Sequence, residues 1–310
     1  MEQGLISWSR EFSFRGKKLF YNRIPFNNRA ERAVEVPIAF DFLGRQESNE
    51  KMLEVGNTLQ YYENALSDVP GVRHRRIVDK FEVGPGISND DIMDIGPEET
   101  YQTIVSISTV EHVGQHCSPT GKYGVRKQAS DFEAPLKAIA KIYDLLAPGG
   151  HALLTVPFGR LTDGGWYIQF SKEYLELLVT SYGIPREALA VGFLKYVAIE
   201  PKWSNPRQVW VETQAEELED VRYDNFWSAA RAIAVIEMTK VERPFALKLM
   251  VAHTALDYQR SRLAKGVGFL VGVVGSWWKK PHPGSSSRKG FLWKIFSQFA
   301  RLTFQRGRLA

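Results

Sequence analysis

IVSISTVEH at residues 104–112, followed by LLAPGGHALLTVPFG at 145–159, is the part of the sequence that decides the fold. The first stretch is an apolar run that ends at a carboxylate and an imidazole, Glu111 and His112. Between the two stretches, residues 131–146 place apolar side chains at helical spacing, and a Pro-Gly-Gly turn follows. Two apolar runs joined through a helix predict parallel strands, and ligands of such sheets bind beyond the carboxyl ends of the strands. Glu111 and His112 are therefore expected at the edge where chemistry takes place.

Further apolar runs predict the rest of the sheet. Strands are expected at 51–56, 74–82, 88–95, 103–109 and 151–158, and at 187–199 and 232–240 as an antiparallel pair at one edge. Helices are expected over 29–43, capped by Asn28, and over 171–182, opened by Ser171. Strands that alternate with helices predict a doubly wound α/β domain over residues 30–243, with a mostly parallel, seven-stranded, Rossmann-like sheet.

The two ends of the chain differ from this central domain. Residues 11–23 alternate apolar and polar side chains around a glycine, which predicts a β-hairpin within the N-terminal segment 1–29. Residues 244–310 predict a basic helical extension. The single cysteine, Cys117, excludes an intramolecular disulfide, and the start of the chain lacks the basic stretch and apolar core of a signal peptide. We therefore expect a cytoplasmic protein.

Charge is distributed unevenly along the chain. Residues 258–310 contain eleven Lys or Arg and no Asp or Glu, whereas the other 257 residues carry 29 basic and 35 acidic side chains. Within 263–308, apolar side chains recur on one helical face between basic ones, which is the composition of an interfacial membrane helix. The apolar run 266–278 is shorter than the roughly 20 residues that span a bilayer as a helix.

We therefore expect residues 263–308 to bind an anionic membrane surface, which makes this a peripheral protein at the inner face of the membrane. The alternative is a C-terminal helix that packs on the protein's own core or on a partner subunit. Binding to nucleic acid is not favoured, because the charge fits but no RNA or DNA module is recognisable.

The order of the signals resembles that of a class I S-adenosylmethionine-dependent methyltransferase over about residues 30–243. The resemblance rests on LEVGN at 53–57, VDKFE at 78–82, Asp91, SISTVEHVG at 106–114, and the LAPGG turn. A bacterial subgroup of such proteins, associated with polysaccharide or glycoconjugate synthesis, is similar at the first, second and fourth of these. The resemblance implies a methyltransferase that uses S-adenosylmethionine and methylates a small molecule or glycan, for example at a sugar hydroxyl.

The resemblance also implies which residues bind the cofactor. Gly56 would let the backbone approach it, Asp79 would accept hydrogen bonds from both ribose hydroxyls, and Asp91 would accept one from the adenine amino group. Asp94 is a competing assignment for the last role. The full set is Glu54, Gly56, Asn57, Asp79, Asp91 and Ser108. Taken singly, each glycine or aspartate is also what an ordinary turn contains.

Two positions depart from the family pattern. Gly56-Asn57-Thr58-Leu59 holds one glycine where the family has a glycine-rich run, and Gln102 stands where an aspartate usually precedes the fourth strand. The departures favour a rival hypothesis, a methyltransferase-like protein that has lost catalysis and serves as a membrane-attached assembly component. A second rival is an enzyme of the same fold with another nucleotide ligand.

Glu111 and His112 are the candidate catalytic residues. A carboxylate and an imidazole whose unperturbed pKa lies near neutrality can take a proton from a hydroxyl as it attacks a methyl sulfonium. Methyl transfer needs alignment more than acid catalysis, so a role in positioning the substrate is a second interpretation. The third is purely structural: His112 hydrogen-bonds a loop backbone, and Glu111 caps the next segment.

Other chemistries are disfavoured by residue spacing. His116 and Cys117 extend Glu111 and His112 to four residues of metal-binding type, but Gly114 and Pro119 oppose a helix that would hold them, so no metal site is expected. The chain has no Gly-x-Ser-x-Gly elbow of a serine hydrolase. SPTGKYG at 118–124 lacks the first glycine of a phosphate-binding loop.

We expect deletion of residues 260–310 to abolish membrane binding. The full-length protein should float with liposomes that contain anionic lipid, because a basic amphipathic helix buries its apolar face in the lipid interface. The shortened protein should remain at the bottom of the gradient. Liposomes of neutral lipid are the control, and equal flotation of both proteins would remove the membrane hypothesis.

Overall fold

The computed structural model describes residues 11–22, 30–69, 71–72, 74–115, 131–200, 207–225, 229–251 and 255–260. All of them belong to the first of the two units into which the chain divides, Met1–Phe269. Asn28, His116, Cys117 and the segment 263–308 lie outside the described residues, so the helix cap and the membrane helix stay predictions. In the described part, no helix is both long enough and apolar enough to cross a bilayer.

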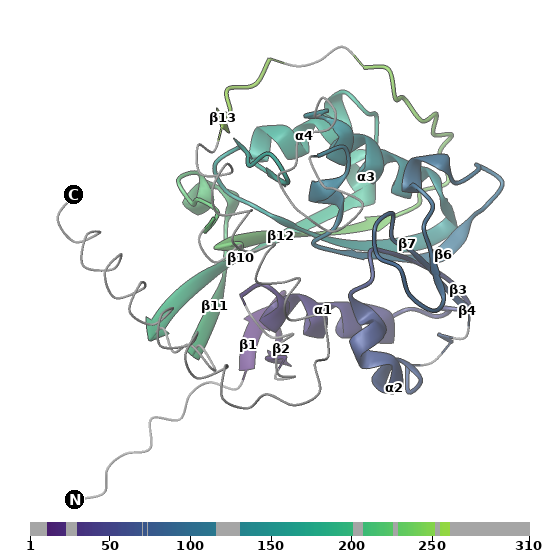
Figure 1. Cartoon of the computed structure of the whole chain (residues 1–310), viewed down its shortest axis with the longest axis horizontal. Coiled ribbons are helices and arrows are strands. Elements are labelled where there is room, and N and C mark those ends of the chain that lie inside the picture. The colour runs from purple at the N-terminus through teal and green to yellow at the C-terminus, as the bar shows by residue number, and fades with distance from the viewer. Residues whose placement is uncertain are drawn as a thin grey trace, which may run out of the picture. The chain divides into compact units, whose positions relative to one another are not determined.

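An eight-stranded mixed sheet forms the centre of the described unit, in the order β11-β10-β12-β7-β6-β3-β4-β5 (Figure 1). The strands are β3 Lys51–Val55, β4 His74–Val78, β5 Ile87–Ser88, β6 Tyr101–Ile107, β7 Leu146–Pro157, β10 Leu189–Glu200, β11 Arg207–Thr213 and β12 Ala232–Thr239. Strands β3 to β7 pair in parallel, and β12 is antiparallel to both β7 and β10. The sheet is therefore α/β and mostly parallel, as predicted.

The prediction of seven strands is wrong, because β11 was missed. Its sequence, RQVWVET, has only three apolar residues between polar ones. It pairs with β10 alone at the edge of the sheet, where Trp210 is buried and Val211 is exposed. The predicted antiparallel pairing of the two late strands is confirmed, but β12 lies inside the sheet, and the edge pair is β10 with β11.

The third predicted strand, at 88–95, is also wrong in extent. Only Ile87 and Ser88 pair with β4, and a 3₁₀ turn follows at Ile92–Asp94. The Asp91 side chain accepts a hydrogen bond from the backbone N–H of Met93, which caps that turn. A side chain that bonds its own backbone in this way competes with strand pairing.

Helices cover both faces of the sheet (Figure 1). Helix α1, Arg32–Gly44, lies on one face, and α3, Ala134–Asp144, with α4, Lys172–Thr180, lies on the other. Successive strand residues alternate between two cores, because Leu153 packs with α1 and Leu154 with α3 and α4. A fourth helix, α2 at Glu63–Leu66, follows a 3₁₀ turn at Leu59–Tyr62 and was not predicted. The doubly wound arrangement agrees with the sequence.

The LAPGG segment begins strand β7 after α3 has ended at Asp144. The pairing with β6 shifts register there, because Tyr101 pairs with Leu146 but Thr103 pairs with His151. A Cβ on Gly150 would lie 2.9–3.1 Å from the carbonyl oxygens of Ala147, Tyr101 and Gln102. The glycine thus allows the register shift within the first part of β7, and the Pro-Gly-Gly turn expected from the sequence is part of the strand.

Two small sheets complete the described unit. The predicted hairpin forms from β1, Glu11–Phe14, and β2, Lys17–Phe20, and its Phe12 and Phe14 are buried in the core on the α1 side. A three-stranded sheet joins β8, Thr162–Asp163, to β9, Ile168–Gln169, and β13, Gln259–Arg260.

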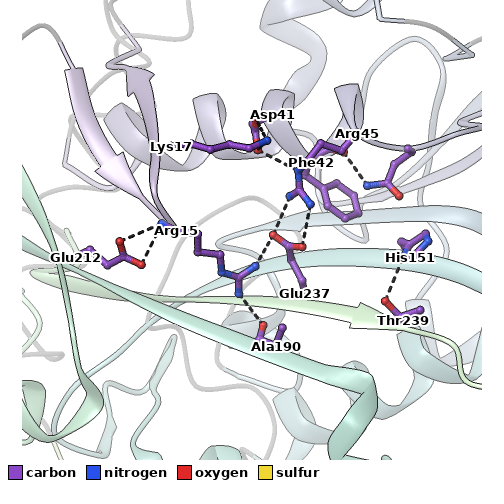
Figure 2. A network of polar contacts seen from close by, with 11 residues as sticks. Arg15, Lys17, Asp41, Phe42, Arg45, His151, Ala190, Glu212, Glu237 and Thr239 are labelled. Atoms are coloured by element: carbon purple, nitrogen blue, oxygen red, sulfur yellow. Dashed lines mark hydrogen bonds and ion pairs between the residues drawn. The ribbon is translucent and has the colours of Figure 1, made fainter.

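A network of charged groups fastens the hairpin and α1 to the sheet (Figure 2). Arg15, in the hairpin turn, and Arg45, at the end of α1, both pair with Glu237 of β12, at 2.7 and 3.0 Å. The backbone N–H of Arg15 donates to Glu212 of β11, and its guanidinium donates to the carbonyl oxygen of Ala190. One turn of the hairpin therefore contacts three strands of the sheet.

We expect Glu237→Gln to lower the free energy of unfolding by about 1–2 kcal/mol, because two guanidinium groups lose their carboxylate and the pairs are neither fully exposed nor fully buried. Urea denaturation measures the change. The control is Lys172→Ala, which removes the exposed Lys172–Glu216 pair and should cost less than about 0.5 kcal/mol. Equal effects of the two changes would show that Glu237 does not fasten the hairpin.

Candidate functional site

A cavity of about 200 Å³ lies at the carboxyl ends of β6 and β7. Glu111 and His112 therefore lie at the edge of the sheet that the sequence predicts. Ser108, which was assigned to the cofactor, lines the same cavity. The lining residues are Glu31, Arg32, Ser108, Glu111, His112, Pro157, Trp166, Tyr223 and Ala230.

The backbone at Ser108 brings the chain into this cavity. Ser108 has a φ of +39°, a conformation that non-glycine residues rarely adopt. Its N–H donates to the carbonyl oxygen and to the hydroxyl of Thr155, and its hydroxyl donates to Glu35 at 2.5 Å. These bonds hold the sharp turn at the end of β6, and a 3₁₀ turn at Val110–His112 follows directly.

The start of α1 contributes charged groups that the sequence analysis did not select. Glu35 is buried and pairs with Arg32 at 2.5 Å, and Glu31 accepts a hydrogen bond from the backbone N–H of Ala230 at 3.1 Å. Burial, reinforced by the charge of Glu35, raises the pKa of Glu31 to about 7. The sequence alone gives little signal for these residues, because charged side chains at the start of a helix usually face water.

Glu111 is buried without an ion pair to any lysine or arginine of the described residues, although the charge of Arg32 acts on it. Its side chain is 4% exposed, and its Oε2 atom has no hydrogen-bond partner among the described residues. Burial raises the pKa of Glu111 well above its usual value, and the carboxylate of Glu35 adds to the rise. Burial thus favours the neutral, protonated form of Glu111 over the ionised form. Its carboxyl group caps no helix in the described structure.

His112 is held by the loop that carries Trp166. Its Nδ1 lies 2.7 Å from the backbone carbonyl oxygen of Trp166, and the two rings stack at 5.1 Å. A carbonyl oxygen only accepts, so Nδ1 carries the proton. Burial lowers the pKa of His112 to about 4, so the imidazole is neutral at pH 7. The structure thus contains the backbone hydrogen bond of the structural interpretation, and Nε2 lies 3.7 Å from Glu111.

Glu54 and Gly56 shape the loop after β3. Oε1 of Glu54 accepts hydrogen bonds from the N–H groups of Thr58 and Leu59 at 2.8 and 2.7 Å, and burial raises the pKa of Glu54 to about 7. Gly56 has a φ of +87°, and a Cβ on it would lie 2.1 Å from the hydroxyl oxygen of Thr109. The space beside this glycine is therefore taken by the loop that follows β6.

The remaining cofactor candidates lie along the same edge of the sheet. The Asn57 amide donates to Gln60 at 2.6 Å, and its Oδ1 is buried without a partner among the described residues. Asp79 follows β4, where its Oδ1 accepts from the N–H groups of Phe81 and Glu82. Its Oδ2 has no hydrogen bond within the described part of the chain. Asp79 thus has one oxygen fixed by its own turn and one available to a ligand.

The carboxylate of Asp91 is bonded to other residues, whereas that of Asp94 is not bonded to any described residue. Besides capping the 3₁₀ turn, Asp91 pairs with Lys80 at 2.5 Å. Asp94 is exposed, and its carboxylate makes no bond to any described residue. None of Glu54, Asn57, Asp79 and Asp91 lines the cavity, so the structure separates them from Ser108, Glu111 and His112.

The residues present fit an adenosyl group at the ribose position. A carboxylate with one fixed and one available oxygen suits a vicinal diol, and Asp79 supplies it. The buried Oδ1 of Asn57 offers a further acceptor. In the described part, no three His, Cys, Asp or Glu side chains are grouped to hold a metal ion.

Comparisons with known proteins show similarity in structure only. No family model and no curated protein matches the sequence. The N-methyltransferase NodS from Bradyrhizobium japonicum, solved with S-adenosyl-L-homocysteine, is 14% identical, with a TM-score of 0.36 over 66% of this chain and 85% of that one. A possible histamine N-methyltransferase from Thermotoga maritima is 13% identical, with a TM-score of 0.37 over 65% and 86%.

The [4+2]-cyclase SpnF is similar to the same degree, at 15% identity and a TM-score of 0.39, over 71% of this chain and 85% of that one. At these identities and TM-scores the similarity assigns no reaction to this chain. Function must be argued from the site itself.

We expect His112 to titrate near pH 4. The imidazole C–H signals, followed by NMR and assigned with His112→Asn, should stay those of a neutral ring down to about pH 5, because burial disfavours the charged form. In the unfolded chain His112 titrates near 6.5, so between about pH 4 and 6.5 the unfolded state binds more protons, and His112 makes stability rise with pH in that window. A midpoint above 6 would contradict the structure.

Proposed function

We propose that the protein is an S-adenosylmethionine-dependent methyltransferase that methylates a small molecule or glycan. The observation that carries the proposal is the juxtaposition of two features at one edge of the sheet. Asp79 offers an available carboxylate oxygen at the end of β4, and a cavity lined mostly by polar residues lies beyond β6. Thr109, next to the cavity residue Ser108, packs against Gly56 and joins the two.

The ends of β3 to β5 would bind the cofactor. Asp79 would accept from the ribose hydroxyls, Asn57 lies on the loop beside it, and Asp91 or Asp94 would accept from the adenine amino group. The exposed pair of Asp91 with Lys80 is weak enough to be exchanged for a ligand. When bound, S-adenosylmethionine supplies a methyl group activated by a positive sulfur.

The cavity would bind the acceptor. Glu111 and His112 would contact it, and the stacked rings of His112 and Trp166 fix the wall against which it lies. Methyl transfer depends on the alignment of acceptor, methyl carbon and sulfur. A rigid wall that orients the acceptor therefore contributes more to the rate here than a strong base would. The basic segment 263–308 would hold the enzyme at an anionic membrane surface.

One observation favours a second function. The side chain of Thr109 fills the space beside Gly56 that a glycine-rich loop leaves for the methionine part of the cofactor. This filled space agrees with a methyltransferase-like protein that has lost the cofactor and serves as a membrane-attached assembly component.

Calorimetry with S-adenosylhomocysteine separates the two functions. We expect micromolar binding by the full-length protein, weakened roughly 10- to 100-fold by Asp79→Asn, which loses hydrogen bonds to a charged group worth about 1.5–3 kcal/mol. Asparagine keeps the oxygen that accepts from the turn, so the loop should stay folded. Glu82→Gln, in the same turn, is the matched control and should bind as the wild type does. If the folded wild-type protein gives no heat of binding, the proposed methyltransferase function is refuted.

A further inference from the structure

The cavity beyond β6 holds more carboxyl groups than cations. Glu31, Glu35 and Glu111 face one guanidinium, that of Arg32, and Arg32 forms its ion pair with Glu35. In the described part of the chain, neither Glu31 nor Glu111 forms an ion pair with a lysine or arginine. Two carboxyl groups at the wall of one cavity are thus left for a ligand.

The unpartnered oxygen of Glu111 points independently to a ligand. Burying a polar atom without a hydrogen bond costs about 1–3 kcal/mol, so such atoms in native proteins usually meet a partner. Oε2 of Glu111 is buried, lacks a partner among the described residues and belongs to a residue that lines the cavity. A donor group that enters the cavity would satisfy it.

Aromatic rings complete the wall. Trp166 and Tyr223 line the cavity, their ring centres lie 5.9 Å apart, and their planes are nearly perpendicular. The face of an aromatic ring attracts a cation, most strongly when the cation is removed from water. One face of Trp166 stacks on His112 and one face of Tyr223 stacks on Tyr167, so only the opposite face of each ring is left for an ammonium group.

We propose that the acceptor binds in this cavity through a protonated amine, and that the methyl group is transferred to its nitrogen. The proposal rests on the proposed methyltransferase function and names its substrate class. A volume of about 200 Å³ suits the amine-bearing end of an acceptor, such as one amino-sugar ring or a short alkylamine, rather than a whole oligosaccharide.

Base strength favours nitrogen over the sugar hydroxyl that the sequence suggested. A hydroxyl is a far weaker acid than an ammonium group, whose pKa is near 10. His112, with its pKa lowered to about 4, is a poor base for a hydroxyl. A carboxylate such as Glu31, whose pKa is raised to about 7, is matched more closely to an ammonium proton.

The atoms and charges of the step balance. Entry of the ammonium group favours the ionised form of Glu111, whose proton leaves to solvent. The ammonium then gives one proton to Glu111 or Glu31, and the free nitrogen lone pair forms a bond to the methyl carbon. The bond between sulfur and that carbon breaks, and its electron pair neutralises the positive sulfur. The products are an N-methyl ammonium group, the neutral thioether and one proton, which passes from the carboxyl group to solvent.

Matched ligand pairs test the proposal on the full-length protein. D-glucosamine is compared with D-glucose, and ethanolamine with ethylene glycol, by NMR titration with and without saturating S-adenosylhomocysteine. We expect at least one amine to bind tenfold or more tightly than its hydroxyl counterpart. Glu111→Gln should remove this preference, and Glu216→Gln, which deletes an exposed carboxylate that pairs with Lys172, should keep it. Equal binding within both pairs, or none, would overturn the proposal.

Proton release provides a readout that needs no variant. Calorimetry of the amine in two buffers of different ionisation enthalpy should show protons released on binding, and affinity should rise with pH from 6 to 8 as Glu31, with its pKa of about 7, ionises. Glu31→Gln serves as the second variant if Glu111→Gln does not fold, and it should reduce the proton release. Absence of proton release would contradict the role of these carboxyl groups.

The failures of the two proposals are distinguishable. Binding of S-adenosylhomocysteine without a preference for amines would support the methyltransferase function and refute the amine as its acceptor. A preference for amines that depends on Glu111, without binding of S-adenosylhomocysteine, would support the amine site and refute the methyltransferase function.

Discussion

The hydrogen bond from Ser108 to Glu35 joins the parts of the molecule on which the candidate site depends. It links the end of β6, a central strand, to the first turn of α1 at 2.5 Å. The same carboxylate pairs with Arg32 through its second oxygen. Because Ser108 leaves the strand in a left-handed conformation, the next turn carries Glu111 and His112 beneath α1. Strand, helix and cavity wall thus meet at one buried carboxylate.

The cost of burying charge explains the protonation states around this carboxylate. An ion removed from water needs a partner or must become neutral. Glu35 has Arg32 and Ser108 as partners, whereas Glu111 forms no ion pair with a described lysine or arginine, and burial raises its pKa well above the usual value. His112 gives its proton up for the same reason. The protonation of the cavity's carboxyl groups should therefore respond to the charge of the group that enters it.

Much of the fold could be predicted because its elements follow local patterns. The five strands from β3 to β7 end in loops whose glycines and aspartates mark the edge of the sheet, although β5 is far shorter than predicted. Strand β11 escaped prediction because an edge strand with one solvated face needs few apolar residues. The site was predicted in part. Ser108, Glu111 and His112 were found from their place after a strand, whereas Trp166 and Tyr223 reach the cavity through pairings between distant loops that a single sequence does not reveal.

Glu31 and Arg32 were missed for a different reason. Charged residues at the start of a helix usually face water, and only the packing of α1 against the end of β6 turns them inward. Burial, rather than residue type, makes them part of the site.

The single glycine after β3 has a physical explanation in the contact between Gly56 and Thr109. A Cβ at residue 56 would collide with the threonine, so one glycine is required even before any ligand is considered. The contact also links two loops, because Thr109 follows directly on Ser108. A ligand that displaces the loop after β3 must therefore move the backbone that positions Ser108 and, three residues on, Glu111. The loop after β3 and the cavity beyond β6 accordingly meet at one side chain, that of Thr109.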